Sequence, residues 1–86
     1  MPQLITAAAI KIGEKVWSLP SPARHHYIIP IINKELNVKT LPKCTQGFLT
    51  SLGFFVDRVE AAEIALDAKQ LVELKSPPRL YTEDLW

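Results

Sequence analysis

Between Pro22 and Leu36, isoleucines recur at helical spacing, and this pattern constrains the fold more than any other feature of the chain. Successive helical residues are about 100° apart, so apolar residues three or four positions apart share a face. Ser21 is expected to be the N-cap, and Pro22 suits the first helical position, where its missing N–H costs nothing. Pro30 removes one donor, so we expect a kink near the middle. The predicted buried face consists of Ile28, Ile29, Ile32 and Leu36.

Strand patterns lie on both sides of this helix. Leu4–Ile12 predicts a first strand, and Lys15–Trp17 is expected to pair back with it as a hairpin. Phe48–Thr50 and Phe54–Val56 predict a second hairpin, in which Gly53 can adopt a positive φ. The sheet therefore contains at least two antiparallel pairs.

A second helix is predicted to begin at Asp57, with Glu60 in the position that a capping box requires. Its apolar face consists mostly of alanines, and Pro77-Pro78 ends regular structure after it. An 86-residue chain supports one modest core. We therefore predict a small α+β fold with two β-hairpins, two helices and an extended C-terminal tail, in a single domain over residues 1–86.

Composition excludes several classes of protein. The net charge of +1 gives no broad basic field, so we expect no binding to nucleic-acid polymers. No apolar run approaches the roughly 20 residues that span a bilayer, and Leu4–Ile10 lacks the basic flank of a signal peptide. Cys44, the only cysteine, cannot form an intramolecular disulfide, which fits a reducing compartment. We expect a cytoplasmic protein without a membrane interaction.

Three basic side chains open the first helix: Arg24, His25 and His26. The helix dipole disfavours cations at this end, whereas the free backbone N–H groups attract anions. A bound phosphate or carboxylate would resolve both tensions. His25 lies at the centre of the isoleucine face, so it is a core histidine with a satisfied ring, the wall of an anion pocket, or a general base.

Arg58 repeats this pattern in the first turn of the second helix, on its alanine side. It either pairs with Asp57, Glu83 or Asp84, or reaches a ligand with its planar guanidinium. Adjacent helical histidines point about 100° apart and no metal-ligand spacing occurs, so we expect no metal site. We also expect no cofactor and no catalytic residue.

Aromatic residues at the end of the chain can stack on a base or fill the core, and Tyr81 and Trp86 are the candidates. Trp86 is expected to dock onto its own domain or onto a second copy. Because Pro77-Pro78 directs the tail away from the second helix, we expect a homodimer in which Leu85-Trp86 packs near the basic helix starts. Glu83 and Asp84 would then approach Arg24 or Arg58.

A set of short segments spread over most of the chain forms a recognisable pattern: Ala8–Ile10, Arg24–His26, Gln46–Phe48, Gly53–Arg58, Glu60–Ala62, Gln70 and Leu80–Trp86. Together these segments resemble a family of small phage-encoded proteins. Lys69 stands where that family often has glycine, and Thr82 where serine is commoner, but neither change removes a charged group.

Phage proteins of this size commonly counter host defence, and the chain is similar to anti-CBASS sponges, which sequester cyclic nucleotide signals. The resemblance implies an immune-evasion protein that binds a small phosphorylated nucleotide, expected to be cyclic, in the host cytoplasm without cleaving it. Arg24 and Arg58 would hold phosphate, His25 or His26 would donate hydrogen bonds, and Tyr81 or Trp86 would cover the base.

Two alternatives remain at this point. In the first alternative, the chain is a small enzyme acting on a nucleotide or an ADP-ribose-like substrate, with His25 or His26 as acid and base and Glu83 or Asp84 assisting. In the second alternative, the chain inhibits a host defence protein by direct interaction, through the acidic helix face or the aromatic tail.

Overall fold

A four-stranded antiparallel sheet forms the centre of the computed structural model, which describes residues 3–40 and 42–86. The strands lie in the order β2-β1-β3-β4, so both predicted hairpins are confirmed and the first strand is central. Gly13 and Gly53 turn the hairpins with φ of +61° and +86°, a region that glycine adopts without steric cost. The strand bounds are β1 (Ile5–Ile12), β2 (Lys15–Pro20), β3 (Thr45–Thr50) and β4 (Phe55–Asp57).

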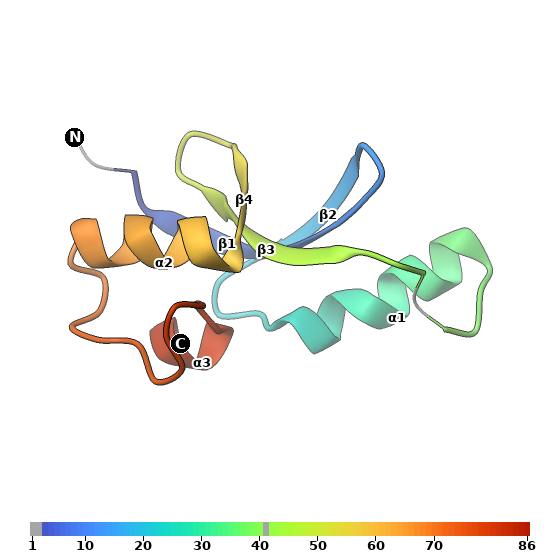
Figure 1. Ribbon diagram of the computed structural model, residues 1–86. Helices are drawn as coiled ribbons and strands as arrows, with labels where there is room; N and C mark the ends of the chain where they lie inside the picture. The colour runs from blue at the N-terminus through green and yellow to red at the C-terminus, as the bar shows by residue number, and fades with distance from the viewer. Residues whose placement is uncertain (1–2, 41) are drawn as a thin grey trace.

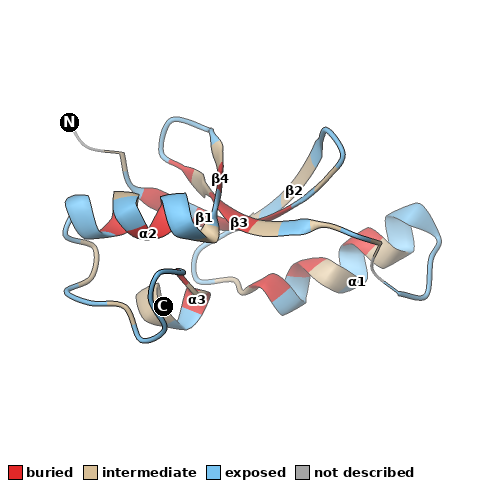
Figure 2. Ribbon diagram, in the orientation of Figure 1, coloured by how far each residue is buried: buried red, intermediate tan, exposed pale blue. Residues whose placement is uncertain are grey.

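Three helices lie on one side of this sheet, and the hairpin turns project to the other side (Figure 1). The strand register explains this arrangement, because the cross-strand partners Ala8, Phe48 and Val56 point to the same face and all three are buried. Figure 2 shows buried residues on β1, β3 and the helix sides that face them. The helices are α1 (His25–Leu36), α2 (Arg58–Asp67) and α3 (Thr82–Leu85).

The first helix begins later than the sequence predicted. The Ser21 N–H donates to the Thr6 carbonyl at 3.1 Å, so Ser21 still continues the pairing of the strands instead of capping a helix. Pro22 lies in the turn that follows, and Arg24 takes the N-cap position with an extended backbone. α1 then continues through Pro30 to Leu36.

The buried face of α1 is narrower than predicted. Ile28 and Ile32 are fully buried, Ile29 is half-buried and Leu36 is exposed. The far end of the helix is joined to β2 by Glu35, which accepts hydrogen bonds from Lys15 and from Trp17 Nε1. Trp17 is half-buried against this end of the core.

The second helix begins where the sequence predicted. The Asp57 side chain accepts hydrogen bonds from the Val59 and Glu60 N–H groups at 3.0 and 2.8 Å, which confirms the N-cap. The helix buries three alanines against the sheet, and their small side chains let its backbone approach Phe48. These residues are Ala61, Ala62 and Ala65.

The tail after Pro77-Pro78 folds back onto its own chain and ends in α3. Leu80 is fully buried, and its N–H donates to the Arg58 carbonyl at 3.0 Å. Trp86 Nε1 donates to the Ala23 carbonyl at 2.8 Å, so the expected docking of this tryptophan occurs within the chain. Trp86 thus packs within a single copy of the chain. The expected homodimer stays a prediction.

A side-chain clamp joins the start of β1 to the segment after α2. Gln70 Oε1 accepts from the Ile5 N–H at 2.7 Å, and Gln70 Nε2 donates to the Ile5 carbonyl at 3.0 Å. One amide side chain thus makes both bonds that a neighbouring strand residue would make.

Within residues 3–40 and 42–86, every helix is too short or too polar to cross a bilayer.

Gly47 provides a test of how tightly β3 packs against β4. A Cβ atom added there would clash with the Val56 carbonyl oxygen and lie 2.8 Å from Phe55 Cζ. We expect Gly47→Ala to lower the free energy of unfolding by about 3 kcal/mol, at the upper end of overpacking costs. Gly13→Ala is the matched control, because open space surrounds Gly13 and only its positive φ is unfavourable, at about 1 kcal/mol. Urea unfolding of both variants measures the difference, and equal losses would contradict the packing described here.

Candidate functional site

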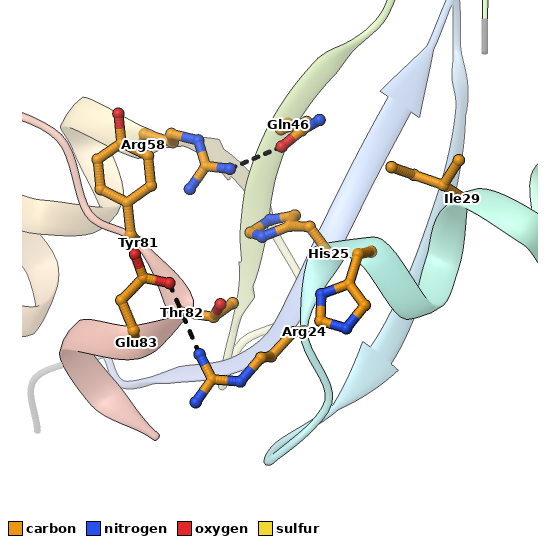
Figure 3. A pocket seen from close by; sticks show the side chains of 9 residues that line it. Arg24, His25, Ile29, Gln46, Arg58, Tyr81, Thr82 and Glu83 are labelled. Atoms are coloured by element: carbon orange, nitrogen blue, oxygen red, sulfur yellow. Dashed lines mark hydrogen bonds and ion pairs between the residues drawn. The ribbon is translucent and has the colours of Figure 1, made fainter. Parts of the chain in front are cut away.

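A pocket of about 310 Å³ opens where the start of α1, β3, the start of α2 and α3 meet (Figure 3). The structure thereby brings together six of the residues that the sequence singled out, from three segments far apart along the chain. They are Arg24, His25, His26, Arg58, Tyr81 and Glu83.

His25 forms the inner wall of the pocket. Its Nε2 lies 2.7 Å from the Gly47 carbonyl oxygen, and because a carbonyl only accepts, Nε2 carries the hydrogen. The ring also meets Phe48 edge to face, with 5.1 Å between centroids. Burial lowers the pKa of His25; the bond to Gly47 opposes this shift, and the Arg58 charge adds to it. His25 is therefore a neutral core histidine that also faces the pocket, and the general-base reading would have to use its other nitrogen.

Arg58 lies opposite, at the first position of α2. Its Nη1 donates to the Leu80 carbonyl at 2.8 Å, and its Nη2 donates to Gln46 Oε1 at 2.7 Å. The guanidinium carbon lies 4.5 Å from the centroid of the Tyr81 ring, a cation–π contact. Burial lowers the pKa of Arg58, but an arginine keeps its charge near neutrality.

Of the two alternatives for Arg58, pairing with Asp57, Glu83 or Asp84 is wrong. In the part of the chain that the structure describes, Arg58 forms no ion pair. Asp57 is used as the cap of α2, and Asp84 accepts from the Tyr81 N–H at 2.9 Å and from the Lys75 N–H at 3.3 Å. The half-buried guanidinium thus has only neutral partners.

Arg24 and Glu83 face each other across the mouth of the pocket, with 3.6 Å between Nη1 and Oε2 (Figure 3). The predicted approach of Glu83 to Arg24 is therefore confirmed. The Arg24 side chain is 35% exposed and that of Glu83 is 61% exposed, so this pair is weak and open to water. Glu83 is the one carboxylate among the residues that the structure places in the pocket lining.

Trp86, which was predicted to cover a base, and Asp84, which was predicted to approach Arg24 or Arg58, both lie outside the pocket lining. The Trp86 ring meets Phe48 edge to face at 6.4 Å between centroids, because burial of the indole requires apolar contact and an acceptor for its N–H. Asp84 fixes the first turn of α3. Both residues hold the wall that carries Tyr81 and Glu83.

Three residues of the pocket lining, Ile29, Gln46 and Thr82, were not predicted from the sequence, and Ile29 was assigned only to the buried face of the first helix. Alternation along β3 puts Gln46 on the same face as Phe48, which is the pattern that could have identified it. Since Gln46 Oε1 accepts from Arg58, its amide N–H groups remain as donors. Within the described ranges, no three histidine, cysteine or acidic side chains gather as metal ligands.

Comparison with known proteins gives one match. A family model described as "Phage T4 y16D protein" matches residues 4–86. No curated protein and no solved structure matches the chain.

The lowered pKa of His25 predicts a pH-dependent stability. Below about pH 6.5, the ordinary histidine pKa, the unfolded chain binds a proton that the folded ring resists. This contribution to stability is therefore complete above that pH and lost as the pH falls below it. We expect His25→Gln, whose amide can still donate to Gly47, to lose less stability than the parent between about pH 7.5 and about pH 5, measured by urea unfolding.

His26→Gln is the control for this experiment, because His26 is exposed at the pocket rim. It should retain the pH dependence of the parent chain. Equal slopes for the parent and the His25 variant would show that the buried ring does not resist protonation.

Proposed function

Given that the chain belongs to the Phage T4 y16D protein family, we propose that it is a phage protein which binds and sequesters a small phosphorylated nucleotide. The proposed setting is the host cytoplasm, and the proposed purpose is evasion of a host defence that uses such a nucleotide as its signal. The pocket described above is the proposed binding site.

The unpaired charge of Arg58 carries this proposal. Cations buried away from water are usually paired, because desolvation without a partner is costly. Arg58 is half-buried and donates only to the Leu80 carbonyl and the Gln46 amide oxygen. A phosphate in the pocket would supply the missing negative charge and accept charge-assisted hydrogen bonds.

The remainder of the lining supports a nucleotide rather than a bare phosphate. Arg24 supplies a second guanidinium, and the Gln46 amide supplies further donors. Ile29 and Tyr81 add apolar and aromatic surface that a base or ribose can contact. The pocket therefore combines groups for a charged end and for an uncharged ring.

Sequestration without cleavage is favoured over turnover. His25, the best-placed acid or base, already uses Nε2 to hold Gly47. Cys44 is partly buried elsewhere, and burial raises the pKa of its thiol, which disfavours the reactive thiolate. The lining in the described residues contains neither cysteine nor serine.

Isothermal titration calorimetry against a panel of mononucleotides and cyclic mono- and dinucleotides tests the proposal. We expect binding of at least one member, and at least about tenfold weaker binding by Arg24→Gln, since a charged hydrogen bond contributes about 1.5–3 kcal/mol. Lys34→Gln is the matched control, because it removes the same charge from an exposed position on α1 outside the pocket. A panel without any binding member, or equal losses in both variants, would refute the proposal.

Two experiments distinguish the proposed function from its alternatives, a small enzyme and an inhibitor of a host protein. Ligand that is incubated with the protein and then freed by denaturation should return unchanged, whereas an enzyme would return a product. A pull-down from host lysate that yields a stoichiometric protein partner, with no nucleotide bound, would instead favour an interaction inhibitor.

A further inference from the structure

The charges that line the pocket are unequal in number. Arg24 and Arg58 contribute two positive charges and Glu83 one negative charge, which leaves a net charge of +1. The buried His25 adds none near neutrality, because it holds Gly47 as a neutral ring. A ligand with a single negative charge would balance this pocket, and a second charge would remain unbalanced.

Glu83 is an acidic residue among the basic side chains that line the pocket. Its carboxylate pairs with Arg24 at 3.6 Å, whereas it raises the pKa of His25 and of Arg58 by less than burial lowers them. No other carboxylate of the described chain lines the pocket. Glu83 therefore offsets part of the positive charge of the two arginines, and its removal would raise the net charge of the lining from +1 to +2.

We propose that Glu83 is a specificity-determining residue which makes the pocket prefer a singly charged phosphodiester, such as a 3′,5′-cyclic mononucleotide, over a doubly charged phosphate monoester. This inference rests on the proposed function and names its ligand class.

The two ligand classes differ mainly in charge. A phosphate monoester has a second pKa of about 6 and carries about −1.5 to −2 charges at pH 7, whereas a cyclic diester has no second ionisation and carries one. The additional charge of the monoester would lie near the Glu83 carboxylate and be repelled by it. Like charges brought together in a site discriminate strongly against the wrong partner.

The size of the pocket favours one nucleotide. A volume of about 310 Å³ is at the lower end of the roughly 300–1,000 Å³ that ligand pockets occupy. A cyclic dinucleotide would bring two phosphates and two bases to this space. The volume and the charge thus both point to a cyclic mononucleotide.

The test uses pairs of ligands with the same base and ribose, in which the phosphate is esterified either at both the 3′ and 5′ oxygens or at the 5′ oxygen alone. Dissociation constants are measured at about pH 7.5, where the monoester is doubly charged, for 3′,5′-cyclic AMP and 5′-AMP and for the corresponding guanine, cytosine and uracil pairs. We expect the parent chain to bind one cyclic nucleotide at least about tenfold more tightly than its monoester, and Glu83→Gln to reduce that ratio at least about tenfold.

Two further measurements separate specificity from general electrostatics and from misfolding. Glu63→Gln makes the same charge change at an exposed position of α2 outside the pocket, and it should leave the ratio unchanged. In the parent chain, the ratio should also shrink as salt rises from about 0.05 M to about 0.5 M, because ions screen exposed charges.

An unchanged ratio in Glu83→Gln, or a parent chain that prefers the monoester, would overturn the inference while leaving nucleotide binding intact. Absence of binding to every nucleotide would overturn both the inference and the proposed function.

Discussion

The packing around Phe48 is the interaction on which the remainder of the structure depends. Phe48 lies on β3, and its ring is fully buried close to side chains from α1, from α2 and from the C-terminal tail. His25 meets it from α1, Arg58 lies 6.0 Å from its centroid at the start of α2, and Trp86 meets it from the tail. Phe48 therefore lies between the starts of α1 and α2, which are far apart along the chain. The pocket opens beside this ring, between the two helix starts.

Local patterns predicted most of the secondary structure. Alternation identified both hairpins, Gly53 identified the turn of the second, and the Asp57 cap located the start of α2 correctly. The error at the start of α1 has a physical reason: Ser21 is a good cap by residue type, but its N–H is already used by the Thr6 carbonyl in the sheet. A good N-cap residue stabilises a helix by only about 1 kcal/mol, so a hydrogen bond to a distant strand can override this preference.

The site was predictable to a similar extent. Basic residues at helix starts identified Arg24, His25 and Arg58, because charge and helix position are both local properties. Their partners were not predictable, since Gln46 and Leu80 reach Arg58 only through the tertiary fold. Two of the three carboxylates that were possible partners for Arg58, Asp57 and Asp84, are used as helix caps. Competition among a few acidic residues thus determines which cation is left with neutral contacts.

The Gln70 clamp on Ile5 has a consequence for the order in which the chain folds. Its two hydrogen bonds join residues 65 positions apart, whereas each hairpin closes over a few residues. The entropy lost on closing a loop grows with its length, so contacts between distant residues form later than local ones. The contacts between the start of β1 and the segment after α2 are therefore expected to form later in folding than the two hairpins.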